Sequence, residues 1–217
     1  MLGSTYRYRL GPKCDTAGTF ARVTALMEKM RRWEMTASWA VWPRSQSYDR
    51  SSNISFPAGN LDTVLHARSI VLGLNRGVTS AEPTPWRNFH TGPRHNDHFL
   101  AEAFRDTSHW GAYMTDLLTE VNSKSKTLDF SSATIRRDVE VLVEQVQAVE
   151  ANDPLFIVIG KKAADAFKKH EALLATALRL TKVRWVEIPH YSASNGATHR
   201  NRPAVYRDLV LEALAGR

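Results

Sequence analysis

Short apolar runs that alternate with amphipathic segments are the feature of this sequence that most constrains its fold. The clearest run, residues 155–159, has five consecutive apolar residues and is followed by Gly160. A run of this length is typical of a strand that is buried on both faces of a sheet. By the same reasoning, we predict three further strands, at residues 69–72, 112–115 and 183–188.

Helices are predicted between and after these strands, where apolar residues recur at spacings of three and four. The first is short and covers residues 99–104, and the second carries a stripe from Ile135 to Val149. The third begins near Lys161, and the last begins at Pro203, a residue favoured in the first turn of a helix. Alternating strands and helices predict an α/β fold, a three-layer α/β/α arrangement around a central four-stranded parallel sheet.

The first 60 residues are predicted to form an extension outside this sheet. Apolar residues at spacings of three and four between Phe20 and Trp33 indicate an amphipathic helix. Residues 42–60 are rich in Ser, Asn, Pro and Gly, which is typical of a long loop. We therefore divide the chain into an N-terminal helix-and-loop extension, residues 1–60, and an α/β domain, residues 61–217.

The composition limits the classes of function. The chain carries 29 Lys and Arg against 22 Asp and Glu, a net charge of +7. This balance suits a polyanion such as DNA, because phosphate neutralisation releases counterions, but it is equally compatible with an ordinary charged surface. The single cysteine, Cys14, allows no internal disulfide and no four-thiolate iron–sulfur cluster. No apolar stretch is typical of a signal peptide or a membrane span, so we expect a cytoplasmic location and no membrane partner.

Polar segments follow the first and fourth predicted strands, and parallel strands bring such segments to one edge of the sheet. Gly73-Leu-Asn75-Arg-Gly77 combines glycines, which let a ligand approach the backbone, with an amide that can hold a water or a base edge. In Pro189-His190-Tyr191-Ser192, His190 could donate a hydrogen bond to a developing anion. Taken separately, the first segment is more typical of a simple turn, and His190 could equally be structural.

Taken together, the two segments resemble the two catalytic motifs of the uracil-DNA glycosylase superfamily. The first is similar to the Gly-Ile-Asn-Pro-Gly motif of the mismatch-specific uracil/thymine glycosylases, with Arg76 in place of proline. The second is similar to the His-Pro-Ser motif of other branches, with Tyr191 in place of proline. The resemblance implies a uracil-DNA glycosylase-like fold and a monofunctional DNA glycosylase. Such an enzyme would hydrolyse the N-glycosidic bond of a flipped-out uracil or modified pyrimidine.

Two further stretches support the resemblance. Residues 155–163 are similar to the superfamily's apolar strand, its Gly-Lys pair and the helix that follows. Residues 85–89, Pro-Trp-Arg-Asn-Phe, and residues 94–99 resemble the region after the first motif, which ordinarily carries an aromatic residue that stacks on the flipped base. The resemblance covers about residues 66–214 and leaves the first 60 residues outside it.

The resemblance implies roles for individual residues. Asn75 would orient the attacking water, and His190 would hydrogen-bond the pyrimidine oxygen as negative charge develops on the leaving base. Phe89 is the first choice for the stacking aromatic and Trp86 the second, although core packing explains either ring equally well. Gly73 would lie against the base. The residues predicted to contact DNA are Arg76, Arg94, Lys161, Ser192, Arg200 and Arg202.

Asp116 departs from the pattern of the superfamily. The segment from Gly111 to Leu117 resembles a strand on which many members carry a base-reading Asn, and Asp116 falls near that position. An ionised Asp only accepts hydrogen bonds, so it would suit a base with an amino donor, as cytosine derivatives have. A modified cytosine in foreign DNA is therefore one hypothesis for the substrate. Alternatively, Asp116 caps the next turn or pairs with an arginine.

No cofactor is expected, and no lysine stands out as a Schiff-base nucleophile, so we predict base removal without strand cleavage. His95 and His98 could chelate a metal, but no third ligand at a clear spacing accompanies them or His90, so no metal is expected. We expect a monomer that binds DNA, with repair and defence both open as roles. Two alternatives remain: a non-catalytic nucleic-acid-binding protein of the same fold, and an enzyme that cleaves the same bond in nucleosides.

Overall fold

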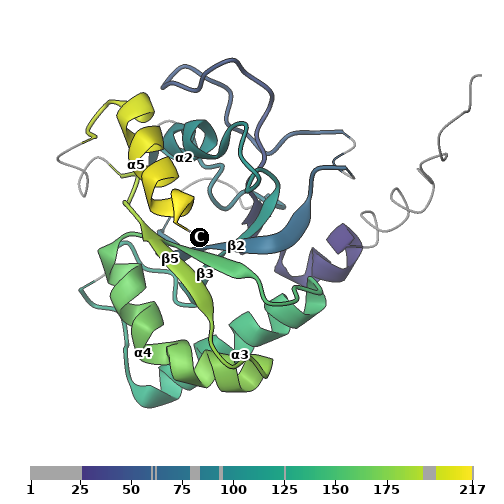
Figure 1. Cartoon of the computed structure of the whole chain (residues 1–217), viewed down its shortest axis with the longest axis vertical. Coiled ribbons are helices and arrows are strands. Elements are labelled where there is room, and N and C mark those ends of the chain that lie inside the picture. The colour runs from purple at the N-terminus through teal and green to yellow at the C-terminus, as the bar shows by residue number, and fades with distance from the viewer. Residues whose placement is uncertain are drawn as a thin grey trace, which may run out of the picture.

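The computed structural model describes residues 26–59, 61, 63–78, 84–92, 95–124, 126–192 and 199–216. Its centre is a five-stranded sheet with the strand order β1-β3-β2-β4-β5 (Figure 1). The strands are β1 Ser38–Trp39, β2 His66–Asn75, β3 Ala112–Leu118, β4 Leu155–Ile159 and β5 Arg184–Ile188. Strands β3, β2, β4 and β5 run parallel to one another, whereas the edge strand β1 runs antiparallel to β3. The four predicted strands and the α/β class are thereby confirmed.

The prediction of a four-stranded, purely parallel sheet is wrong, because β1 adds a fifth, antiparallel strand at the edge. Ser38 pairs with Met114 and Trp39 pairs with Tyr113. A strand of two residues is too short to show an alternating pattern in the sequence. Its pairing is supported by the burial of Trp39, whose indole packs edge-on against Tyr113 with 5.1 Å between the ring centroids.

Helices cover both faces of the sheet (Figure 1). The four α-helices with described bounds are α2 Asp97–Phe104, α3 Ser132–Ala148, α4 Lys161–Leu178 and α5 Pro203–Ala215. They correspond to the four helices that the spacing of apolar residues predicts after residue 60. Residues 26–30 are also helical and continue into the 3-10 helix η1, Arg31–Trp33. The start of the predicted N-terminal helix, including Phe20, lies outside the described residues.

Two apolar cores lie on opposite faces of the sheet, because side chains alternate along each strand. On β2, Ile70 and Leu72 join the core beneath α3 and α4, whereas Val71 joins the core beneath α2 and α5. On β4, Phe156 and Ile157 divide between the two cores in the same way. Helices α2 and α5 also contact each other, as do α3 and α4. The sheet is therefore the middle one of three layers.

The described residues of the predicted N-terminal extension pack against the sheet. Trp39 lies in the core shared with α3 and α4, and Trp42, Tyr48 and Ile54 lie in the core shared with α2 and α5. Residues 42–59 form neither helix nor strand, as predicted, yet these three side chains are buried. This segment is a packed part of the fold up to residue 59, and the predicted boundary at residue 60 stays a prediction.

Candidate functional site

The candidate residues of three strands point toward one face of the sheet at its carboxyl edge. Gly73 and Asn75 follow Val71 at intervals of two residues on β2, so all three face α2 and α5. Asp116 follows Met114 of the same core on β3, and Gly73 pairs with Asp116. His190 stands two residues beyond Ile188, the last residue of β5 and a member of the same core. The sheet therefore brings Asn75, Asp116 and His190 to its carboxyl edge, on the adjacent strands β3 and β2 and on β5 beyond β4.

Asn75 is held so that its amide nitrogen and its oxygen have different roles. Its Nδ2 donates to the carbonyl oxygens of Asn122, Arg76 and Glu120, at 2.6, 3.0 and 3.3 Å. Three carbonyl oxygens would repel an amide oxygen at that place, so the orientation of the amide is fixed. No described residue donates a hydrogen bond to Oδ1, and the side chain is partly exposed. Oδ1 is thus a fixed acceptor for an external donor such as water.

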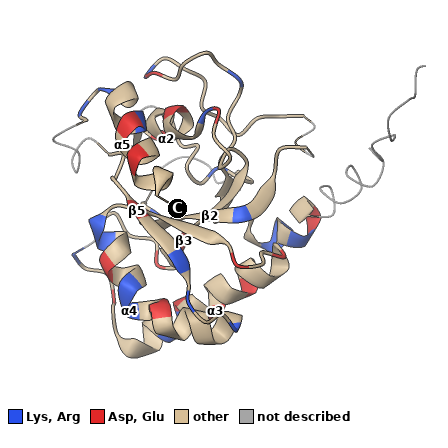
Figure 2. Cartoon of the chain, viewed as in Figure 1, with Lys and Arg blue, Asp and Glu red and all other residues tan. Residues whose placement is uncertain are grey.

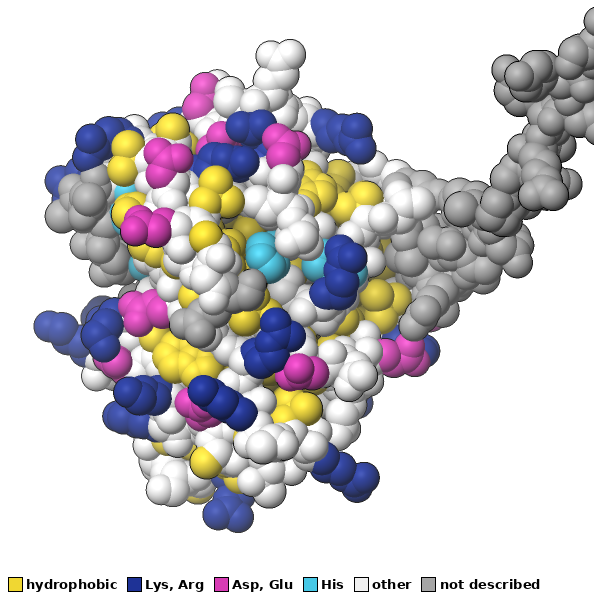
Figure 3. Space-filling model, viewed as in Figure 1, with side chains coloured by type: hydrophobic (Ala, Val, Ile, Leu, Met, Phe, Trp, Pro, Cys, Tyr) yellow, Lys and Arg dark blue, Asp and Glu magenta, His cyan; other side chains and the backbone are white. Residues whose placement is uncertain are grey.

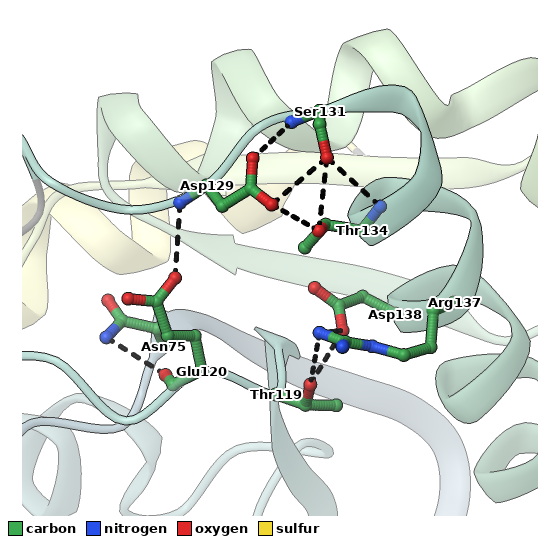
Figure 4. Close-up of polar contacts among 8 residues, drawn as sticks. All are labelled: Asn75, Thr119, Glu120, Asp129, Ser131, Thr134, Arg137 and Asp138. Carbon is green, nitrogen blue, oxygen red and sulfur yellow. Dashed lines mark hydrogen bonds and ion pairs between the residues drawn. The ribbon is translucent and has the colours of Figure 1, made fainter.

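The loop that holds Asn75 is itself anchored to the N-terminus of α3 (Figure 4). The carboxylate of Glu120 accepts a hydrogen bond from the backbone of Asp129 at 3.1 Å. Asp129 in turn accepts hydrogen bonds from Ser131 and Thr134, and Ser131 caps α3. A chain of polar contacts therefore fixes the loop after β3, and with it the side chain of Asn75.

His190 is a neutral histidine with a defined tautomer. Its Nδ1 accepts a hydrogen bond from the backbone N–H of Ser192 at 3.0 Å, so the proton of the neutral ring lies on Nε2. Burial lowers the pKa of His190 to about 4, and the positive charges of His199 and Lys162 add to this effect. At neutral pH, His190 therefore offers an uncharged Nε2–H donor.

The backbone around His190 is held by two aromatic residues of the final segment. Nε2 of His199 lies 3.0 Å from the carbonyl oxygen of His190, and the Tyr206 hydroxyl donates to the carbonyl of Pro189 at 2.8 Å. Beneath the imidazole lies Gly160, with φ +83°. A Cβ on Gly160 would stand 2.8 Å from Cβ of His190. Only glycine suits this backbone conformation and this close approach.

Asp116 and Phe89 crowd against Gly73. A Cβ on Gly73 would stand 2.2 Å from Oδ1 of Asp116 and 3.1 Å from the ring of Phe89. Burial raises the pKa of Asp116 to about 6, while a hydrogen bond from Asn88 and the positive charge of Arg76 oppose the rise. The predicted base-contacting residues Gly73, Phe89 and Asp116 are therefore in one cluster. Phe89 is only 5% exposed, so its ring is almost completely buried in this cluster.

Tyr191 links the β5 end of the site to the Asp116 end. Its ring is stacked on His190 with 5.0 Å between centroids and an interplanar angle of 17°. Burial raises the pKa of its hydroxyl well above the usual range, and the negative charges of Asp97 and Asp116 contribute. Asp97 is itself buried, and Thr91 donates two hydrogen bonds to its Oδ2. The residue that replaces the motif's proline is thus a part of the site.

Trp86 is not part of this cluster. Its backbone and that of Phe89 both have positive φ, +59° and +63°, but their rings join different cores. Trp86 packs against Trp39 and Phe56 on the other side, with ring centroids 6.2 and 6.4 Å away. Trp86 is therefore a core residue, which is the alternative to base stacking that the sequence analysis named.

The residues predicted to contact DNA have different surroundings. Arg76 donates to the backbone carbonyl of Met35 at 2.5 Å, and Lys161 pairs with Asp165 at 2.5 Å. Ser192 contributes its backbone N–H to His190. Arg200 and Arg202 are exposed in the turn that leads into α5, and Arg94 lies outside the described residues.

Basic side chains do not gather in a single patch on the one face that the figures show. Lys and Arg occur on several elements of the fold, interleaved with Asp and Glu (Figure 2). The space-filling view shows the same mixture across its face (Figure 3). Two shallow hollows run along α3, lined by residues such as Arg136 and Glu140, on the face of the sheet opposite to the site. They contain none of the predicted site residues.

The histidines considered as metal ligands are separated by their packing. His90 is buried, with its ring nitrogens 3.1 Å from the carbonyls of Ile54 and Trp39. His95 is exposed, whereas His98 is buried against Phe99. In the described part of the chain, no group of three or more His, Cys, Asp or Glu side chains could hold a metal ion. No helix within it combines the length and apolar character needed to cross a membrane.

Asn88 is the polar side chain of the site that sequence reasoning missed. Its Nδ2 donates to Oδ2 of Asp116 at 2.8 Å and to the carbonyl of Thr36 at 2.9 Å. Asn88 lies outside the predicted strands and helices and does not directly follow a strand, so position alone could not identify it. Its only sequence signal is its place beside Phe89, in the stretch that resembles the superfamily.

The chain matches no protein-family model, and no curated protein sequence matches it. The chemistry of the site is therefore inferred from its own residues and their geometry.

Proposed function

We propose that this protein is a DNA glycosylase that hydrolyses the N-glycosidic bond of a flipped-out pyrimidine and leaves an abasic site. The observation that carries the proposal is the pairing of two fixed groups at one edge of the sheet. One is the acceptor Oδ1 of Asn75, to which no described residue donates, and the other is the neutral Nε2–H donor of His190. The parallel strand order β3-β2-β4-β5, with helices on both faces, supports a uracil-DNA glycosylase-like fold.

The two groups stand on strands that are not adjacent in the sheet. Strands β2 and β5 are separated by β4, and neighbouring strands lie about 4.8 Å apart, so their ends are about 10 Å apart. Gly160, at the end of the intervening β4, lies beneath the imidazole of His190 and so lets this side chain pack closely over the end of β4.

The two groups serve opposite ends of the bond that breaks. A water molecule that donates a hydrogen bond to Oδ1 of Asn75 attacks the sugar carbon C1′. The electron pair of the C1′–N bond leaves with the base. The Nε2–H of His190 donates to the base oxygen on which negative charge develops. The proton that the water loses ends on the departing base. A neutral donor is already present at neutral pH because His190 does not ionise there.

Asp116, at the same edge, is proposed to read the base. Its Oδ1 lies over Gly73 beside the Phe89 ring, and an ionised carboxylate accepts a hydrogen bond from an amino group. This favours a cytosine derivative over uracil as the substrate. The exposed Arg200 and Arg202 are proposed to contact phosphates beside the flipped nucleotide.

The test is the formation of abasic sites in duplexes that contain modified pyrimidines, with purified wild type, Asn75→Ala and His190→Ala. One well-placed donor is worth about 100- to 1000-fold in rate, so His190→Ala should lose about that much, and Asn75→Ala at least about 100-fold. Asn152→Ala and His109→Ala, which lie away from the carboxyl edge, serve as matched controls and should retain the rate. Wild type that binds DNA but forms no abasic sites would identify a non-catalytic binding protein instead.

A further inference from the structure

The two oxygens of the Asp116 carboxylate have different surroundings. Oδ2 accepts the hydrogen bond from Nδ2 of Asn88 at 2.8 Å. Oδ1 lies over Gly73, at 2.2 Å from the position of a Cβ on that residue, and no described residue donates a hydrogen bond to it. Any side chain at position 73 would displace this oxygen. Oδ1 is therefore the one that a ligand at the edge of the sheet can reach.

Asn88 can act on Asp116 only as a donor. Its Nδ2 also donates to the carbonyl of Thr36 at 2.9 Å, so both amide hydrogens point to oxygen acceptors. Rotating the amide by half a turn would place its oxygen against a carbonyl and a carboxylate, which is unfavourable. A fixed donor stabilises the ionised form of Asp116 over the protonated form.

The surroundings of Asp116 have opposing effects on its pKa. Arg76 lies near it with a positive charge, and the Tyr191 hydroxyl, whose pKa is raised by the negative charges of Asp97 and Asp116, lies on the β5 side. Burial raises the pKa of Asp116 to about 6, against the opposing contributions of Asn88 and Arg76. Loss of the Asn88 donor would therefore bring the titration of Asp116 into the neutral range.

We propose that Asn88 is a positioning residue that keeps Asp116 a pure acceptor and thereby selects bases that carry an amino group. The inference rests on the proposed glycosylase function and names the substrate class, cytosine derivatives. A protonated Asp116 can instead donate to the carbonyl of a uracil-type base, so the choice between the two bases depends on Asn88.

The test compares excision of 5-hydroxymethylcytosine and 5-hydroxymethyluracil from the same duplex between about pH 5 and pH 8. These bases share the 5-substituent and differ at C4, where one has an amino group and the other a carbonyl. For wild type, the preference for the cytosine base should rise with pH and level off above about pH 7. Asn88→Ala should raise the pH midpoint of this change in base preference by about one unit, because the ionised Asp116 loses one hydrogen bond. Asn88→Asp, of similar size, should move it further, because a second carboxylate opposes ionisation.

Ser38→Ala is the matched control. Ser38 donates to the carbonyl of Trp86 at 2.7 Å and so joins the same two segments as the Asn88–Thr36 bond, without contacting Asp116. It should leave the base preference and its midpoint unchanged. Equal slowing of both bases by Asn88→Ala, with no shift of the midpoint, would overturn the proposal. A wild-type preference for the uracil base at about pH 8 would do the same.

Failure of the glycosylase function can be told apart from failure of this inference. If wild type releases neither these two bases nor any other modified pyrimidine, the proposed function fails, and carbon-13 NMR of the Asp116 carboxyl group decides the role of Asn88. An upward shift of its midpoint in Asn88→Ala or Asn88→Asp, relative to Ser38→Ala, supports the positioning role. An unchanged midpoint in both variants contradicts it.

Discussion

His190 and Asp116 are titratable side chains of the site, and burial favours the neutral form of each. It lowers the pKa of His190 to about 4 and raises that of Asp116 to about 6. The outcome at neutral pH differs, because His190 is then far above its pKa while Asp116 is close to its own. His190 is thus a constant, uncharged donor, whereas Asp116 is the group whose role responds to pH.

The state of His190 can be measured directly by nitrogen-15 NMR of its ring. We expect the neutral tautomer with the proton on Nε2 at pH 7, and no protonation until the pH approaches about 4. Below its ordinary pKa of 6.5, the unfolded chain binds a proton that the folded protein does not. His190 therefore lowers the free energy of unfolding as the pH falls from 6.5 toward 4. A midpoint near 6.5, or a proton on Nδ1, would contradict this description.

The site residues differ in how well the sequence could predict them. Asn75, Asp116 and His190 lie at or just beyond the ends of apolar strands, and parallel pairing brings such positions together. Asn88 acts through a loop that folds back onto Thr36, a contact that no local pattern encodes. The two aromatic residues near Asn88 were equally hard to assign from the sequence. Trp86 and Phe89 look alike in sequence, yet the backbone between them directs their rings into different cores.

At the scale of elements, Gly160 joins the end of β4 to the start of α4 and supports His190. Replacing it with Ala would strain the backbone at φ +83° and press a Cβ against the imidazole. We expect Gly160→Ala to lower the free energy of unfolding by about 1–3 kcal/mol and the rate of base release by at least about tenfold. The two readouts are chemical denaturation and the abasic-site assay.

Gly59→Ala separates strain from contact with His190. Gly59 also has positive φ, +120°, but a Cβ there would meet nothing within 4 Å. This control should lower stability without changing the rate. If Gly160→Ala changes only stability, as Gly59→Ala does, the packing of His190 on Gly160 does not matter for function.

Element prediction succeeded where patterns were long and failed where they were short. The five apolar residues of β4 and the helical spacings of α3 and α4 are repeated signals, and these elements are present. Strand β1 has two residues, and both are buried. A strand of two buried residues gives no periodic signal, so the fifth strand could not be foreseen.

At the scale of the whole molecule, the N-terminal segment and the α/β part share the site. Thr36 and Met35 of this segment accept hydrogen bonds from Asn88 and Arg76, both of which act on Asp116. The net charge of the chain is +7, but on the face shown the Lys and Arg side chains are interleaved with Asp and Glu, so the proposal of DNA as substrate depends on the site more than on a basic surface.

The central claim, cleavage of a base–sugar bond, is tested most directly by the mass balance of the reaction. The purified protein is incubated with a duplex that contains a modified cytosine, and free base and abasic strand are quantified by mass spectrometry. We predict equal amounts of free base and abasic site, an intact strand, and loss of both products in the Asn75→Ala, His190→Ala double variant. Tight DNA binding with no free base released from any modified pyrimidine would contradict it.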